Sequence, residues 1–284
     1  MDPIRLGCVK FLNTLPLIEG LRACRDIQIA AAVPSKLIGM LERDEVDIAI
    51  ASVIDAAASP IDVALLPVGM IGCDGLTMTV RVYSASPLEE LDEICADTDS
   101  HTSVALMQVI MHRTYGRRIR VVDFDARERI AIHPGATTDD AEWPAAMLLI
   151  GDKIVTDAPP ASKYPYQLDL GAAWRELTGL PFVYAMWMCQ RERADDPRVR
   201  LGAAILERQR RHNSTRLDWI VDARAAERHW PEELAREYVG SRLRYEVGAR
   251  EREAVETFLA AAAELNLAPQ KPVHWADDAA LAAR

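Results

Sequence analysis

The stretch Val9-Lys10-Phe11-Leu12-Asn13-Thr14-Leu15-Pro16-Leu17 indicates how this chain folds. A short apolar strand, residues 4–11, runs into the polar pair Asn13 and Thr14, and Pro16 then opens an apolar helix. A strand, a polar tip and a helix start are the means by which an α/β protein presents side chains and free backbone N–H groups to a ligand. An amide at such a tip suits a polar organic acid, but an Asn before a helix also commonly serves only as its cap.

Strand and helix signals alternate through the first part of the chain. The expected elements are a strand over 27–33, a helix over 34–42, and apolar strands over 47–53 and 63–68. This alternation predicts a parallel sheet with helices on both faces. The next segment, residues 77–84, reads as a half-exposed strand that leaves this first unit.

A second α/β unit begins near Pro87. It contains a helix over 102–115, short strands over 119–124 and 147–150, and a helix over 174–178. An apolar strand over 182–189 carries the chain back, and the sequence from 195 onward is helical. We therefore expect an α/β protein of two domains: residues 1–84 form the first part of domain I, 85–184 form an inserted domain II, and 185–284 complete domain I.

Composition limits the classes of function. The chain has 284 residues, half of them hydrophobic, so it is long enough to bury a large core. Its net charge of −10 argues against sequence-independent binding of nucleic acid, which needs a basic surface. An anionic ligand must then be held by local dipoles and placed cations rather than by the overall field.

The sequence also gives expectations for location and metals. No secretory signal is recognised at the N-terminus, and the apolar runs are too short to span a bilayer. Five scattered cysteines without a CxxC pair indicate reduced thiols and argue against a zinc site. We expect a cytoplasmic protein with no membrane partner. The chain offers no indication of its oligomeric state.

Six stretches carry a family resemblance. The run Phe11-Leu12-Asn13-Thr14-Leu15-Pro16-Leu17 resembles the N-terminal signature of the chorismate dehydratases of the futalosine-dependent menaquinone route. Further matches follow in order at residues 41–52, 73–79, 100–103, 148–152 and 169–187. The resemblance thus covers residues 4 to 187, and it implies the two-domain fold of type 2 periplasmic binding proteins, with the ligand in the cleft between the domains.

The resemblance implies a carbon–oxygen lyase that dehydrates chorismate to 3-[(1-carboxyvinyl)oxy]benzoate. Formation of an aromatic ring drives such a reaction, so neither a metal nor another cofactor is expected, and no H-E-x-x-H, Gly-x-Gly-x-x-Gly or P-loop motif occurs. We assign the catalytic role to Asn13, whose amide hydrogen-bonds the departing hydroxyl or orients a carboxylate. No motif supplies an obvious catalytic Glu or His, so two proton acceptors stay open: the enolpyruvyl carboxylate of the substrate itself or a group of the protein.

The same resemblance implies the substrate contacts. Helix N–H groups and hydroxyls around Thr102 and Ser103 form an anion site, with His101 beside them, although a structural role for His101 stays open. The remaining expected contacts are Thr14, Ser52, Thr79 and Asp152. A capping role stays open for Ser52, and for Asp152 a helix cap is the favoured alternative. The family often has serine at the position of Thr79, and the hydroxyl is kept. Lys10 departs from the family pattern and either adds a cation near the cleft or points away from it.

Three alternatives remain. The first is a non-catalytic binding protein for a small organic acid with the same fold. The second is the related dihydroxynaphthoate synthase, which typically begins with an acidic Ser-Pro-Asp-like motif instead of the Phe-Leu-Asn-Thr found here. The third is the effector domain of a transcription regulator, against which the absence of a helix-turn-helix segment before residue 4 counts.

Overall fold

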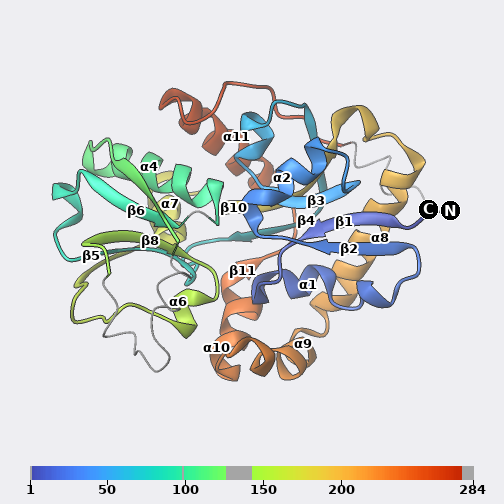
Figure 1. Cartoon of the computed structure of the whole chain (residues 1–284), viewed down its shortest axis with the longest axis horizontal. Coiled ribbons are helices and arrows are strands. Elements are labelled where there is room, and N and C mark those ends of the chain that lie inside the picture. Colours follow the sequence, from blue (N-terminus) through green and yellow to red (C-terminus); the bar gives the residue numbers. More distant parts are fainter. Residues whose placement is uncertain (1, 98, 126–142, 277–284) are drawn as a thin grey trace.

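The computed structural model describes residues 2–97, 99–125 and 143–276. Its two β-sheets, each flanked by helices, lie side by side (Figure 1). The first sheet has the order β11–β4–β10–β3–β1–β2, and the second has the order β7–β6–β8–β5–β9. None of the helices in these residues is both long and apolar enough to cross a membrane.

The first sheet is mixed rather than wholly parallel. Its strands are β1 (Ile4–Cys8), β2 (Ile27–Ala31), β3 (Ile48–Ser52), β4 (Val63–Cys73), β10 (Phe182–Gln190) and β11 (Leu243–Arg244). β1 pairs in parallel with β2 and β3, as the alternating pattern predicts. β10 lies between β3 and β4 and is antiparallel to both, so β1, β2, β3 and β4 point the same way and end at one edge.

The second sheet repeats this plan. Its strands are β5 (Val80–Ser84), β6 (Glu93–Asp97), β7 (Arg120–Phe124), β8 (Ala146–Ile150) and β9 (Tyr166–Asp169). β6 pairs in parallel with β7 and β8, whereas β5 is antiparallel to β8 and β9. The carboxyl ends of the parallel strands again share one edge.

The chain passes between the sheets twice, at residues 74–79 and 179–181. β5 pairs only with strands of the second sheet and β10 only with strands of the first, among the described residues. We therefore propose to place the domain boundaries in these two connections rather than at residues 84 and 184.

Helices flank both sheets (Figure 1). They are α1 (Leu15–Ile18), α2 (Pro34–Glu42), α3 (Asp55–Ala58), α4 (His101–Tyr115), α6 (Lys153–Thr156), α7 (Leu170–Thr178), α8 (Pro197–Ser214), α9 (Leu217–Arg224), α10 (Glu232–Glu237) and α11 (Ala249–Glu264). The C-terminal helix α11 packs against both α4 and β10 (Figure 1), so it joins the two units. At this junction Trp174, Phe182 and Phe258 make edge-to-face ring contacts, with centroids 5.0–6.0 Å apart.

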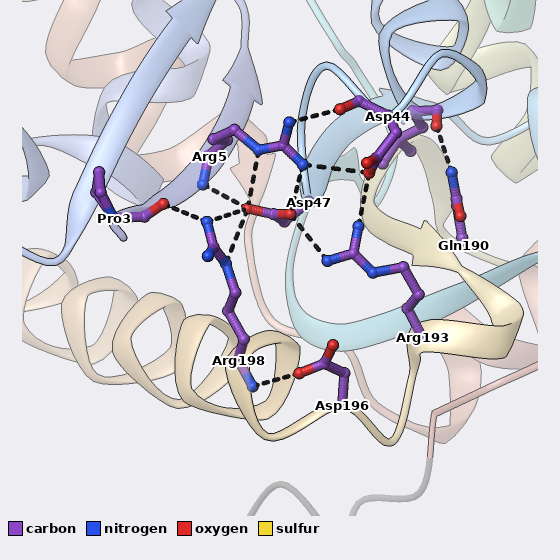
Figure 2. A network of polar contacts seen from close by, with 9 residues as sticks. Pro3, Arg5, Asp44, Asp47, Gln190, Arg193, Asp196 and Arg198 are labelled. Carbon is purple, nitrogen blue, oxygen red and sulfur yellow. Dashed lines mark hydrogen bonds and ion pairs between the residues drawn. The ribbon is translucent and has the colours of Figure 1, made fainter. Parts of the chain in front are cut away.

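A buried ion cluster lies at the edge of the first sheet where the parallel strands begin. The Asp47 side chain is fully buried just before β3 and contacts Arg5 at 2.8 Å, Arg193 at 3.0 Å and Arg198 at 3.1 Å (Figure 2). Desolvation alone would raise the pKa of Asp47, but its hydrogen bonds and ion pairs with the arginines outweigh that effect and hold the pKa well below its usual range. The cluster ties β1 and β3 to the start of α8, away from the edge where the parallel strands end.

Candidate functional site

A cavity lies where the carboxyl ends of the strands of the two sheets face each other. It holds about 580 Å³ of space not filled by atoms, part of it open to solvent. Both units line the cavity, through Val9, Phe11, Asn13, Pro34, Ile50, Ser52, Ile71, Thr77, Thr79, Val80, Ser100, Ser103, Ile150, Gly151, Tyr184, Ala185, Tyr238 and Leu243.

Asn13 lines this cavity from the end of the first strand. β1 ends at Cys8, earlier than expected, and a 3-10 turn, η1 (Leu12–Thr14), precedes α1. The N-cap residues of these two elements are Phe11 and Thr14, and neither element has a side-chain capping hydrogen bond. The capping interpretation of Asn13 is therefore wrong: its amide is half-buried in the cavity wall.

Thr14 lies behind Asn13 and is absent from the cavity lining. Its side chain is buried, and its Oγ1 donates a hydrogen bond to Asn13 Oδ1 at 3.1 Å. This contact orients the amide, so the NH₂ group of Asn13 is the part left to donate elsewhere.

Thr79 lines the cavity where the chain crosses into the second sheet. Its hydroxyl lies 2.5 Å from the phenol of Tyr238, which also lines the cavity. Asp169 supports this crossing, because its carboxylate accepts the backbone N–H groups of Thr77 at 2.9 Å and Met78 at 2.8 Å. Met78 has a φ of 76°, an unusual value for a residue other than glycine, and it separates two threonines that both reach the cavity.

Two buried tyrosines of the wall are absent from the sequence-based site. Tyr238 pairs with Thr79, and Tyr184 pairs with Thr77 at 2.7 Å between hydroxyl oxygens. Burial raises the pKa of both phenols well above the ordinary value, so both remain neutral O–H groups. Tyr184 lies within the matched stretch 169–187, whereas Tyr238 lies in none of the six stretches. Each tyrosine is brought to its threonine only by the tertiary fold.

The N-terminus of α4 borders the cavity through two serines. Ser100 is its N-cap: its Oγ accepts the Ser103 N–H at 3.2 Å and donates to Ser103 Oγ at 3.0 Å. Ser100 and Ser103 both line the cavity, and Ser52 lines it from the end of β3. The arrangement directs hydroxyls and the positive end of a helix dipole at one region, which favours an anion.

His101 and Thr102 do not line this cavity. Thr102 Oγ1 accepts the backbone N–H of Ile54 at 3.3 Å, and His101 Nδ1 lies 2.8 Å from Asp55 Oδ1. The hydrogen bond to Asp55 raises the pKa of His101, against the opposing effect of desolvation. Each helical residue is rotated by about 100° from the last, so consecutive residues cannot all face one cavity. Both side chains instead join the second unit to the first.

Asp152 also lies outside the lining, although its neighbour Gly151 belongs to it. Asp152 is the N-cap residue of α6, but its side chain makes no capping hydrogen bond there. Its carboxylate instead accepts the backbone N–H of Leu12 from the other unit, at 3.3 and 3.4 Å. Burial raises the pKa of Asp152 to about 6.

The described residues of the lining are electrically neutral. Lys10 is exposed and lies outside the lining, and Lys153 is engaged by Asp97 and by Asp99 at 3.2 Å. In the part of the chain that the structure describes, no group of three or more His, Cys, Asp or Glu side chains is arranged to hold a metal ion. Hydroxyls, an amide and a helix terminus are thus the polar groups that this wall offers to a ligand.

Comparison with known proteins identifies the family. A family model described as menaquinone biosynthesis matches residues 4–264. The chain is 26% identical over 244 residues to the chorismate dehydratase of Thermus thermophilus, covering 79% of this chain and 83% of that protein.

Solved structures share the fold at low sequence identity. A structural-genomics protein from Archaeoglobus fulgidus superimposes with a TM-score of 0.67 at 15% identity, covering 93% of this chain and 97% of that one. The periplasmic aliphatic sulphonate binding protein of Escherichia coli gives a TM-score of 0.61 at 14% identity, covering 95% of each chain. These likenesses confirm the periplasmic-binding-protein-like fold that the sequence predicts. With the family match over most of its length, the chain belongs to the menaquinone biosynthesis family.

Proposed function

We propose that this protein is a chorismate dehydratase, a carbon–oxygen lyase that forms 3-[(1-carboxyvinyl)oxy]benzoate in menaquinone biosynthesis. The observation that carries the proposal is Asn13 in the wall of the cavity between the two sheets, freed from any capping role, in a chain of this family. The 26% identity to a chorismate dehydratase supports the choice of substrate.

The proposed reaction is an elimination of water. The C–H bond at ring carbon 3 and the C–O bond at ring carbon 4 break, the ring becomes aromatic, and hydroxide leaves to combine with the proton. No net oxidation or reduction occurs. The protein must hold two carboxylates, orient the ring and stabilise the negative charge that develops on the departing oxygen.

Different residues of the cavity wall are proposed to stabilise the developing charge and to bind the carboxylates. We propose that the Asn13 amide stabilises the negative charge on the departing oxygen, because the Thr14 contact occupies only Oδ1 of this amide and leaves its NH₂ group to donate. We propose that Ser103 and the N-terminus of α4 bind one carboxylate of the substrate. We expect Ser52, at the end of β3, to contact the ligand as well. An amide is not a base near neutral pH, so we propose that the enolpyruvyl carboxylate of chorismate accepts the proton from carbon 3.

A second candidate is a binding protein without chemistry. The likeness to a sulphonate-binding protein favours it, as does a neutral wall able to bind an anion reversibly. The related dihydroxynaphthoate synthase of the same pathway is a further candidate. We place the proposed reaction in the cytoplasm, in keeping with the five free thiols and a biosynthetic family.

The test is to incubate purified protein with chorismate and to analyse the mixture by liquid chromatography with mass detection. Dehydratase activity predicts a product lighter than chorismate by one water. Calorimetry on the same preparation separates the alternatives: binding of chorismate without product indicates a binding protein, and neither binding nor product refutes chorismate as the ligand.

A further inference from the structure

Asp169 holds the first crossing between the two units, residues 74–79, in its observed path. The residue is 8% exposed, and its carboxylate accepts the backbone N–H of Thr77 on Oδ1 at 2.9 Å and that of Met78 on Oδ2 at 2.8 Å. A backbone N–H can only donate, so the direction of both hydrogen bonds is fixed. The two partners lie 92 and 91 residues before Asp169 in the chain, so the contact is made by the tertiary fold.

The backbone of Met78 needs this support. Its φ of 76° lies in the left-handed region, which residues other than glycine seldom adopt. Strained backbone of this kind persists only where the surrounding structure holds it, and it is often found at functional sites. Met78 separates Thr77 and Thr79, whose side chains are buried and both line the cavity. The hydrogen bonds from Asp169 therefore fix the residue whose conformation sets where Thr79 lies relative to Thr77.

A glycine of the same segment packs directly on the crossing. Gly171 is buried at the start of α7, two residues after Asp169. A Cβ at Gly171 would lie 2.0 Å from Thr77 Oγ1 and 2.5 Å from the carbonyl oxygen of Gly75. Only a residue without a side chain lets α7 approach the crossing so closely. Asp169 and Gly171 thus hold the same stretch of backbone, one by hydrogen bonds and the other by close packing.

Capping of α7 accounts for only part of what Asp169 does. Asp169 is the N-cap residue of α7, and its Oδ1 accepts the backbone N–H of Ala172 at 3.0 Å. A cap satisfies N–H groups of its own helix, as Asp196 does for α8 by accepting the N–H of Arg198 at 2.8 Å. Two of the three N–H groups that Asp169 accepts belong to the crossing instead, and one of them occupies Oδ2.

We propose that Asp169 is a positioning residue, whose carboxylate clamps the crossing at Thr77 and Met78 and so places the Thr79 hydroxyl in the cavity wall for contact with the substrate. This role rests on the proposed function. It adds to the substrate contact expected of Thr79 the group that fixes where that hydroxyl lies.

The experiment is the variant Asp169→Asn, assayed in the full chain with chorismate as substrate. Asparagine caps helices about as well as aspartate, so the start of α7 should be kept. Its amide has a single oxygen, however, and cannot accept N–H groups at both positions that the carboxylate oxygens occupy. We expect kcat/KM to fall roughly tenfold to a hundredfold, because a displacement of about 1 Å in a positioned group can cost that much.

A double-mutant cycle shows whether this loss passes through Thr79. Thr79→Val should cost at least as much as Asp169→Asn, and the double variant should be within about twofold of Thr79→Val alone. The losses of Asp169→Asn and Ser103→Ala should instead multiply, because Ser103 reaches the cavity from a different element, α4. Asp196→Asn is the matched control for a changed helix cap, and its kcat/KM should stay within about twofold of wild type.

A second variant covers a failure of Asp169→Asn to fold. Serine also caps helices well and has one acceptor oxygen on a shorter side chain, so Asp169→Ser should show the same loss and the same cycle. A folded Asp169→Asn protein with the kcat/KM of wild type, or losses that multiply with those of Thr79→Val, would overturn the role of Asp169 alone. A wild-type protein that makes no product from chorismate would overturn the proposed function, and this role with it.

Discussion

The carboxylate of Asp152 in the second unit accepts the backbone N–H of Leu12 in the first, at 3.3 and 3.4 Å. Leu12 directly precedes Asn13, so this hydrogen bond holds the turn that carries the candidate catalytic amide against the second unit. Asp152, which the family resemblance predicts as a ligand contact, thus supports the turn that carries Asn13.

Asp152 should make stability depend on pH. Its pKa in the folded protein is about 6, above the ordinary value of 3.8, so the folded state holds this proton more tightly than the unfolded state. The stabilisation is fully present below the ordinary pKa and is lost as pH rises through 6. We expect the melting temperature of Asp152→Asn to rise relative to that of wild type as pH rises from 4 to 7, and the difference then to stay constant. A difference that is the same at every pH would contradict the shifted pKa.

Asn13 should act on turnover rather than on binding. Asn13→Ala should lower kcat on the order of a hundredfold, the scale of one lost oxyanion donor, with little change in KM. Asn13→Asp keeps the shape but places a carboxylate before a dianionic substrate, so both turnover and affinity should fall. Near-normal turnover in a stable Asn13→Asp protein would contradict the assigned role.

Substitutions of Ser103 and Thr102 should have different effects on KM. Ser103 lines the cavity and is proposed to hold a carboxylate that is charged in ground and transition state alike, so Ser103→Ala should act mainly on KM. A lost hydrogen bond to a charged group is worth roughly 1.5–3 kcal/mol, or about tenfold or more in KM. Thr102→Val is the neighbouring control: it removes the contact with Ile54 and should alter stability more than KM. Equal KM values for Ser103→Ala and wild type would remove this subsite.

The Asp47 cluster should contribute stability that is lost in acid. Because the arginines lower its pKa in the fold, Asp47 stabilises the protein fully above the ordinary pKa near 4, and this contribution falls as pH drops toward the depressed folded value. Asp47→Asn removes the buried negative charge that pairs with three arginines, so its melting temperature should fall sharply at pH 7. Asp44→Asn is the matched control, since Asp44 is largely exposed although it contacts Arg5 and Arg193. Equal melting temperatures for the two variants would contradict the weight given to burial.

Local sequence patterns predict the frame of this protein well. The alternation of apolar runs and helix starts gives the α/β class, and a polar tip after the first strand places Asn13 at the cavity. Ser100 is recognisable as a helix cap because short-range hydrogen bonding determines caps. The mixed direction of the first sheet is not predictable in this way, because β10 enters it from a distant part of the chain.

The site is less predictable because its contacts are distant in sequence. Tyr238 and Thr79 are 159 residues apart, and nothing in the sequence near Tyr238 predicts that the two hydroxyls meet in the cavity wall. The sequence predicts His101, Thr102 and Ser103 as neighbouring ligand contacts, whereas helical rotation turns His101 and Thr102 toward the first unit and leaves Ser103 at the cavity. Asp152 was expected at the ligand, but its partner, the Leu12 N–H, is 140 residues away.

The central claim is the elimination of water from chorismate, and proton NMR of chorismate carrying deuterium at ring carbon 3 tests it most directly. We expect wild-type protein to produce aromatic signals with the enolpyruvyl vinyl protons retained, while the deuterium passes into the solvent. Asn13→Ala should do so far more slowly. A stable, folded wild-type protein that binds chorismate but leaves its ring signals and deuterium unchanged would contradict the account.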